Sequence, residues 1–386
     1  MATHASVSGA APWRRLLPVY LSCFGYGVQA GAAMPLVPLA LEHRGIDNVT
    51  IGLVEAVWGI GMILTAPQVP KLAARLGAVK LVCAALLASA LLAVSFAYTE
   101  NLALWFVLSF TLGMVGGVPW VVSEIWINLV VDEQRRGRAV AIYAALMACG
   151  MAIGPIALQA VGVYGPHPFL ACAAMALLVA LPLLPSANSA PAIASAEEGG
   201  FRRVFLLVPA LLIGAAASGL GEQAAFSFLP IYGLASGVPA ETGVLWLSAF
   251  VIGNIALQWP IGWLADHADR RLVLAGCALG SAALAGSLSL IDPHGRAILV
   301  LLLLWGGISF AIYSVGLTLL GQRFKGDDIA RANAALTTVY TFGGMIGPPI
   351  AGTALDTVGK PGFGLSLAAF YVIAGVGALL ALRRPG

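Results

Sequence analysis

Three glutamates lie inside long apolar stretches of this sequence, where an ionisable side chain is rare. They are Glu55, Glu124 and Glu222, and no lysine or arginine lies in the same three stretches. An ionised carboxylate in a membrane-spanning helix costs about 2.5–3.5 kcal/mol, so such a residue faces a wet cavity or carries a proton. A carboxyl group that gains and loses a proton as its access to water alternates is what proton-coupled transport requires. These three glutamates are therefore the candidate proton-coupling residues.

Glu222 is the strongest of the three candidates. Gly214, Ser218 and Phe226 lie at four-residue spacings from it, so the four residues share one face of a helix. At a rise of 1.5 Å per residue, Glu222 lies about 27 Å along a stretch that begins at residue 204. Proton uptake or contact with substrate is the favoured role, and a structural hydrogen bond is the alternative.

Glu124 and Glu55 lie closer to the ends of their stretches. Glu124 shares a helical face with Trp120 and Asn128. A side chain that reaches the water at the lipid headgroups explains Glu124 equally well. Glu55 lies roughly 9 Å into its stretch, which favours a vestibule or interfacial position.

Other polar and aromatic side chains in the apolar stretches would complete a cavity. The candidate substrate-binding residues are Tyr26, Gln29, Trp120, Asn128, Phe226, Asn254, Gln258 and Tyr313. Hydrogen bonding between helices is the alternative role for the amides. A cavity without a fixed cation disfavours organic anions, which normally need arginine or lysine. Neutral or cationic amphipathic compounds fit it better.

The composition shows which elements must hold these residues. The 386 residues are 60% hydrophobic and 10% charged, against about 45–50% and about 25% in soluble domains. This excludes a soluble enzyme, a nucleic-acid binder and a disordered protein. A helix needs about 20 apolar residues to cross a bilayer. Twelve stretches predict an all-α integral membrane protein with twelve transmembrane helices, near 16–40, 49–70, 79–97, 102–130, 139–161, 168–185, 204–232, 242–263, 271–291, 296–320, 330–355 and 362–382.

The basic residues predict the orientation. With a cytoplasmic N-terminus, 17 of the 20 lysines and arginines fall in cytoplasmic segments, as the positive-inside rule requires. Arg14 and Arg15 precede the first stretch, which is too long for the apolar region of a signal peptide and is therefore a span. We expect a multi-pass protein of the bacterial inner (plasma) membrane with both termini in the cytoplasm.

The chain repeats itself at half its length. The segment 138–155, RAVAIYAALMACGMAIGP, matches 331–348, RANAALTTVYTFGGMIGP, at seven of eighteen positions with an offset of 193. We therefore predict two six-helix pseudo-repeats, residues 1–185 and 204–386, joined by a cytoplasmic linker at 186–203. Parallel six-span repeats are an architecture of secondary transporters.

The cysteines and histidines predict no cofactor and no metal site. The five cysteines all lie within spans without a C-x-x-C pair, and the five histidines all lie in tails or loops. Buried cysteines of this kind are usually small hydrophobes. No group of catalytic or metal-ligating residues can be assembled, so we expect a protein that is not an enzyme.

The loop GWLADHADRR resembles the cytoplasmic G-x-x-x-D-R-x-G-R-R signature of the major facilitator superfamily. The matching residues are Gly262, Asp266, Arg270 and Arg271, and the related loop PKLAARLGAVK keeps Arg75, Gly77 and Lys80. The resemblance implies the twelve-helix fold of that family. It also implies that Asp266 latches the cytoplasmic gate against Arg138, and that Arg270, Arg271, Arg75 and Gly77 belong to the gating loops.

A glycine motif is similar to one associated with exporters of this family. It comprises Gly150, Gly154 and Pro155, and its second copy comprises Gly343, Gly347 and Pro348. Glycines four residues apart allow close helix packing, and a proline bends the helix. A tight helix contact without any bearing on transport direction explains the same residues.

The resulting hypothesis is a proton-coupled secondary transporter that exports a small neutral or cationic organic compound by alternating access. Its partners would be a small-molecule substrate, protons and the lipid bilayer, with no nucleic acid, and we expect a monomer. One alternative is a proton symporter that imports a neutral solute. Another, from a different class, is a substrate-sensing receptor derived from the same fold.

Overall fold

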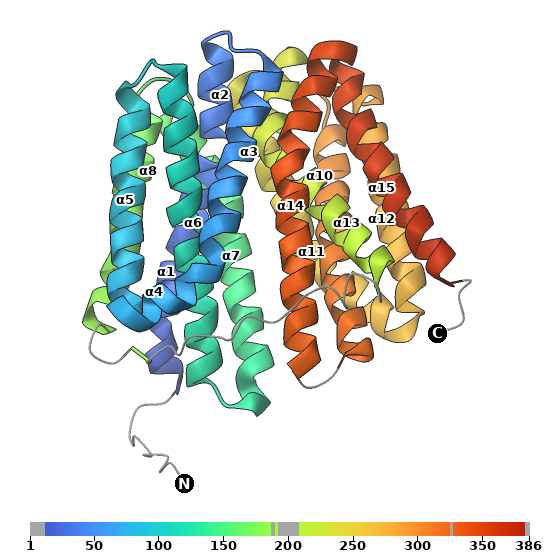
Figure 1. Ribbon diagram of the computed structural model, residues 1–386. Coiled ribbons are helices and arrows are strands. Elements are labelled where there is room, and N and C mark those ends of the chain that lie inside the picture. Colours follow the sequence, from blue (N-terminus) through green and yellow to red (C-terminus); the bar gives the residue numbers. More distant parts are fainter. Residues whose placement is uncertain (1–11, 187–189, 192–207, 325–326, 383–386) are drawn as a thin grey trace.

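The computed structural model describes residues 12–186, 190–191, 208–324 and 327–382, and every regular element in these ranges is a helix (Figure 1). The predicted linker at 186–203 lies almost entirely outside them. The boundaries proposed for the two halves therefore stay predictions.

Six predicted spans form the N-terminal half. Its elements are α1 (Pro12–Ala33), α2 (Leu36–His43), α3 (Asn48–Thr65), η1 (Ala66–Gln68), α4 (Val69–Leu76), α5 (Ala78–Tyr98), α6 (Leu102–Val130), α7 (Glu133–Val161), α8 (His167–Ala180) and η2 (Leu181–Ser186). The first span consists of α1 and α2, because Pro35 between them has no backbone N–H to continue the helix. The second span continues from α3 through η1 into α4.

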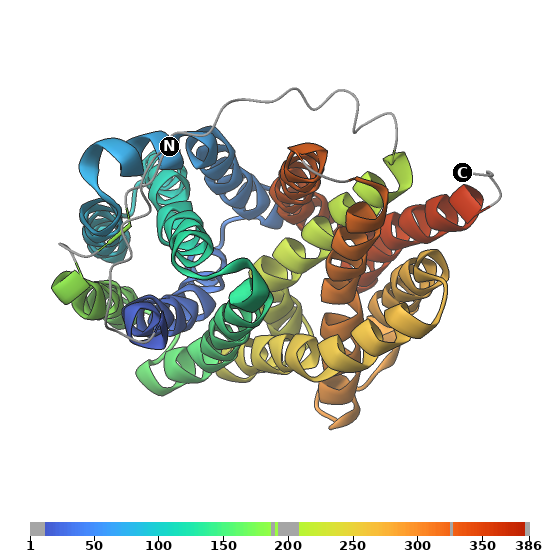
Figure 2. The same ribbon diagram turned by 90° about the horizontal axis from the view of Figure 1, so that it is seen from below.

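Six further spans form the C-terminal half. Its elements are α10 (Pro209–Ala235), α11 (Ala240–His267), α12 (Arg270–Gly286), η3 (Leu288–Leu290), α13 (Ala297–Arg323), α14 (Asp327–Val358) and α15 (Lys360–Leu382). Both halves begin at the same end of the bundle, where α15 also ends (Figure 1). We call this end the terminal face and the other end the opposite face. Seen from below, the two halves lie side by side (Figure 2).

Two helices differ from the other spans in hydropathy and charge. By length, hydropathy and charge, ten of the described segments qualify as membrane spans, and α10 and α14 are not among them. These two helices pack extensively on each other, as α1 and α7 do in the other half, and α14 also packs on α3. Contact with other helices replaces contact with lipid, so polar side chains are tolerated there. Glu222 lies on one of these two central helices.

The predicted repeat is visible in matching helix contacts. A Cβ added to Gly113 on α6 would overlap the carbonyl oxygen of Trp58 on α3. At an offset of 193, a Cβ on Gly306 of α13 would overlap the carbonyl oxygen of Phe250 on α11. Both pairs of helices therefore approach to backbone contact at equivalent positions. This supports the twelve-helix arrangement in two six-helix pseudo-repeats.

The two halves bond to each other near the opposite face. Asn48 Nδ2 and Val49 N at the start of α3 donate to the Asp356 carboxylate near the end of α14 over 2.7 and 3.0 Å. Ser248 Oγ on α11 donates to the Ala152 carbonyl oxygen on α7 over 2.8 Å. The described conformation is therefore closed at the opposite face.

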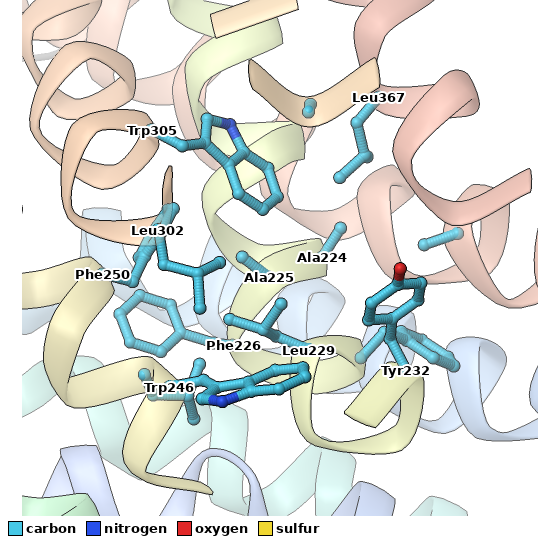
Figure 3. Close-up of a cluster of buried hydrophobic side chains, with 14 of the residues drawn as sticks. Ala224, Ala225, Phe226, Leu229, Tyr232, Trp246, Phe250, Leu302, Trp305 and Leu367 are labelled. Carbon is cyan, nitrogen blue, oxygen red and sulfur yellow. The ribbon is translucent and has the colours of Figure 1, made fainter. Parts of the chain in front are cut away.

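An aromatic cluster fixes α10 within the C-terminal half (Figure 3). The ring of Phe226 meets that of Phe250 edge-on with centroids 6.2 Å apart, and Phe250 meets Trp305 at 5.2 Å. Such pairs contribute about 0.5–1.5 kcal/mol beyond their burial. Because Glu222 lies one helical turn before Phe226, this packing also fixes the position of the carboxyl group.

Candidate functional site

Glu222 is the centre of a buried hydrogen-bond network. Its side chain is 1% exposed. Ser218 on the same helix lies with its Oγ 2.5 Å from Glu222 Oε1, and the Tyr340 hydroxyl on α14 donates to Glu222 Oε2 over 2.7 Å. Ser218 Oγ also lies 2.9 Å from the carbonyl oxygen of Ser309 on α13. The network thus joins three helices of the C-terminal half through a single carboxyl group.

Glu55 lies between the two halves. Its side chain on α3 is 8% exposed, and Ser227 Oγ on α10 donates to Glu55 Oε2 over 2.9 Å. Gln223, the neighbour of Glu222 in the chain, also lies near Glu55. Glu55 is therefore buried between the halves in this conformation, and the vestibule or interfacial position expected for it stays a prediction. Through Ser227, α10 contacts Glu55 as well as carrying Glu222.

Glu124 is exposed and has a different kind of partner. Trp120 Nε1 donates to Glu124 Oε1 over 2.5 Å, and Asn128 Nδ2 donates to the Glu124 carbonyl oxygen over 2.9 Å. The predicted common face of these residues is therefore present on α6. Tyr26 on α1 extends it, because its hydroxyl donates to the carbonyl oxygen of Gly116 one turn before Trp120.

Tyr313 lies between the two halves of the candidate site. Its hydroxyl group on α13 is 2.9 Å from Thr337 Oγ1 on α14, and its ring centroid is 4.8 Å from that of Tyr340. Glu124 of the N-terminal half and Glu222 of the C-terminal half both lie near Tyr313. The structure therefore gathers carboxyl groups and aromatic side chains from both halves around one region.

The other candidate substrate-binding residues divide into two groups. Phe226 is packed in the aromatic cluster in this conformation, and its predicted role in substrate binding stays a prediction. Asn254 is half-buried and Gln258 exposed, on the part of α11 nearer the terminal face. Gln29 is buried on α1, and its Oε1 has no hydrogen-bond partner among the residues that the structure describes. A buried acceptor of this kind is costly unless a donor reaches it.

The gating residues lie at the terminal face. Arg270 Nη2 bonds to Asp266 Oδ1 over 2.8 Å, and the Asp269 carboxylate caps α12 by accepting from the backbone N–H of Arg271. Asp266 therefore pairs within its own loop in this conformation, and the predicted pairing with Arg138 stays a prediction.

Gly77 connects α4 to α5 with φ +85°, a conformation that favours glycine. Its neighbour Arg75 is exposed in the last turn of α4. The turn between α4 and α5 therefore favours glycine at position 77 for a structural reason that does not depend on gating.

The two copies of the glycine motif allow equivalent close helix contacts in the two halves. A Cβ on Gly150 of α7 would overlap the carbonyl oxygen of Phe24 on α1. A Cβ on Gly343 of α14 would likewise overlap that of Ala216 on α10. One turn later, a Cβ on Gly154 would overlap the carbonyl oxygen of Val28. A Cβ on Gly347 would overlap that of Leu220. Pro155 and Pro348 follow them inside the same helices.

Sequence reasoning missed Tyr340, Ser227 and Asp356. Each contacts a residue at least 118 positions away, a separation that spacing within a single helix does not reveal. Tyr340 and Ser227 lie within predicted spans, where aromatic and hydroxyl residues are common. Asp356 lies just beyond the predicted end of its span at residue 355, where an acidic residue is common.

Two further features bear on what the site can hold. Within the described ranges, no group of three or more His, Cys, Asp or Glu side chains is placed to bind a metal ion. A hollow of about 320 Å³ beside Tyr232 and Lys360 lies near the opposite face and touches none of the three glutamates. The carboxyl groups themselves are therefore the chemically distinctive feature of the interior.

The sequence matches the family model described as Major Facilitator Superfamily over residues 19–246 and 211–386. It is 24% identical over 340 residues to the uncharacterized MFS-type transporter YfkF of Bacillus subtilis, covering 86% of both chains. It is 25% identical over 315 residues to the uncharacterized MFS-type transporter YcaD of Escherichia fergusonii, covering 81% of both.

Solved structures show the same fold. The nucleoside transporter NupG superposes with a TM-score of 0.79 at 14% identity, over 96% of this chain and 99% of that one. A D-xylose-proton symporter superposes with a TM-score of 0.75 at 14% identity, over 95% and 97%. At such identities the likeness concerns the fold alone.

Proposed function

The chain belongs to the major facilitator superfamily of membrane transporters, and on this premise we propose that it is a proton-coupled exporter. It moves a small neutral or cationic organic compound by alternating access, and Glu222 is its principal proton site. Both termini lie in the cytoplasm, so the terminal face is the cytoplasmic face.

The observation that carries the proposal is the surroundings of Glu222. The carboxyl group is buried between α10, α13 and α14, and its two partners are hydroxyl groups. The salt bridges found among the described residues, such as that of Arg270 with Asp266, involve none of Glu55, Glu124 and Glu222. A buried carboxyl group without a cationic partner is stable only in its neutral form or beside water. Such a group is suited to carry a proton between the two sides.

The substrate class follows from the groups around Glu124 and Tyr313. Trp120 and Tyr26 on the N-terminal side, with Tyr313 and Tyr340 on the C-terminal side, supply aromatic faces, and Glu124 supplies an exposed carboxylate. Aromatic faces attract cations as well as apolar groups. This combination supports a neutral or cationic amphipathic compound over an organic anion.

The test is flux in proteoliposomes at clamped membrane potential, with tetraphenylphosphonium as a cationic probe and an internal pH-sensitive dye. An antiporter moves the probe toward the acidic side, whereas an importing symporter moves it toward the alkaline side. We expect movement toward the acidic side. Movement toward the alkaline side would show import instead of export, and it would not contradict the assignment of Glu222 as the proton site.

The matched variants are Glu222→Gln and Glu100→Gln, since Glu100 is an exposed carboxylate in the loop between α5 and α6. We expect Glu222→Gln to reduce proton-driven flux to the level of protein-free liposomes, and Glu100→Gln to leave it unchanged. Proton-driven flux at the wild-type rate in Glu222→Gln would refute the assignment of the proton site.

A further inference from the structure

The hydroxyl group of Ser218 has two acceptors within hydrogen-bond distance but only one proton. Its Oγ lies 2.5 Å from Glu222 Oε1 and 2.9 Å from the Ser309 carbonyl oxygen. A backbone carbonyl can only accept, and so can an ionised carboxylate. With Glu222 ionised, Ser218 would satisfy one of the two contacts and leave the other as two acceptors facing each other.

A protonated Glu222 removes this conflict. The acid O–H then donates to Ser218 Oγ, and Ser218 donates its own proton to the Ser309 carbonyl oxygen. Tyr340 donates to the second carboxyl oxygen of Glu222 over 2.7 Å. In this arrangement each hydroxyl proton of Glu222, Ser218 and Tyr340 forms one hydrogen bond to one acceptor.

We infer that Ser218 is a positioning residue for the proton of Glu222, and that the described conformation is the proton-loaded one. The inference rests on the proposed role of Glu222. The hydrogen bond from α10 to α13 then exists only while Glu222 carries its proton, because an ionised Glu222 draws the Ser218 proton to itself.

The bond from Ser218 to the Ser309 carbonyl oxygen lies close to Tyr313, a candidate substrate-binding residue. Ser309 precedes Tyr313 by one turn of α13, and Tyr313 contacts both Thr337 and the ring of Tyr340. Release of the proton therefore removes one contact between α10 and α13, one turn before Tyr313. This is a physical route from the proton site to a candidate substrate-binding residue.

The other titratable groups around Glu222 are phenols or lie farther along the helices. From α14 and α13 these are Tyr340 and Tyr313, and from α15 it is Tyr371, whose hydroxyl group lies 2.6 Å from Ser309 Oγ. Glu55 of α3 bonds to Ser227, five residues beyond Glu222 on α10. The titratable residues of α2 and α11 lie at or near the ends of those helices: Glu42, His43, Glu241, Asp266 and His267.

The test is infrared difference spectroscopy of the purified full-length protein at neutral pH. The stretching band of a protonated carboxyl group should be present in the wild type and absent in Glu222→Gln. Ser218→Ala should shift that band, because the acid O–H loses its acceptor, and Ser218→Thr should restore it. Ser281→Ala should leave the band in place, because Ser281 is equally buried and its Oγ has no hydrogen-bond partner.

Two outcomes would overturn the inference. The first is the absence of a protonated-carboxyl band that depends on Glu222. The second is a band that Ser218→Ala leaves at its wild-type position. If Ser218→Ala does not fold, Ser218→Cys supplies a weaker acceptor and should still shift the band.

Flux measurements keep this inference separate from the proposed function. A band that depends on Ser218, together with wild-type proton-driven flux in Glu222→Gln, supports the inference and refutes Glu222 as the coupling site. A missing band together with loss of flux in Glu222→Gln refutes only the inference.

Discussion

Glu222, Glu55 and Glu124 differ in their hydrogen-bond partners rather than in residue type. Glu222 bonds within one half, Glu55 bonds across the two halves, and Glu124 is exposed beside Trp120. A buried carboxyl group with hydroxyl partners is suited to hold a proton, whereas a more exposed carboxylate is accessible to a cationic substrate. The same residue type thus supports two different roles in the proposed cycle.

Glu124→Gln tests the second of these roles. We expect it to weaken binding of tetraphenylphosphonium by about 1 kcal/mol, roughly fivefold, because a partly solvated charge pair is lost. Binding of an uncharged amphipathic compound should change much less. The measurement is isothermal titration of detergent-purified protein with both kinds of compound. Equal losses for charged and uncharged compounds would show that Glu124 shapes the site without acting through its charge.

At the scale of elements, the central feature is the contact of α10 with α14. Gly343 on α14 meets the backbone of α10 at Ala216, and Gly347 meets it one turn later at Leu220. Backbone contact at these points sets the separation of the two helices. That separation brings the Tyr340 hydroxyl group within reach of Glu222.

Gly343→Ala tests this packing against Gly276→Ala, because a Cβ on Gly276 of α12 meets nothing within 4 Å. We expect Gly343→Ala to lower the free energy of unfolding by about 1–3 kcal/mol, since the added methyl group forces the helices apart. Gly276→Ala should be neutral, or stabilising by about 1 kcal/mol through helix propensity. Thermal unfolding in detergent measures both. An unchanged melting temperature for Gly343→Ala would contradict the backbone contact.

At the scale of the whole molecule, the two halves are held together at the opposite face by Asp356. Its carboxylate accepts from Asn48 Nδ2 and from the backbone N–H of Val49 at the N-terminus of α3. A negative charge is favourable at a helix N-terminus, where backbone N–H groups lack partners. Opening of this face has to break both bonds, so Asp356 is a latch between the halves.

Asp356→Ala should raise the population that is open at the opposite face, by roughly fivefold for about 1 kcal/mol. The measurement is the distance between spin labels at two exposed positions in different halves, after replacement of the five native cysteines. The positions are Glu100, in the loop between α5 and α6, and Leu290, the last residue of η3. A distance distribution identical to that of the wild type would rule out the latch.

Asp47→Ala is the matched control for this experiment. The Asp47 carboxylate also caps α3, by accepting from the backbone N–H of Thr50 over 2.9 Å, but it belongs to the same half. This bond lowers the pKa of Asp47 below its usual value. Asp47→Ala should therefore weaken α3 without changing the distance between the halves.

The repeat explains how much of the architecture could be predicted. Apolar stretches of about 20 residues define spans because lipid cannot satisfy backbone groups, so each helix must bond within itself. The offset of 193 between residues 138 and 331 reports the duplication directly. Both features are local or periodic, and both agree with the structure. The break at Pro35 and the failure of α10 and α14 to meet the hydropathy criterion were not predicted, although both are properties of the sequence. What the sequence does not show is which neighbouring helices cover α10 and α14.

The sequence alone determined that this chain is a two-fold repeated helical membrane protein with three intramembrane carboxyl groups. The tertiary structure decided which partners those groups meet: Ser218 and Tyr340 for Glu222, and Ser227 for Glu55. It also decided that Phe226 packs in the aromatic cluster, although Phe226 and Glu222 share one face of α10. The physical reason is that helical periodicity fixes which residues share a face, whereas the rotation, tilt and neighbours of each helix fix what that face meets.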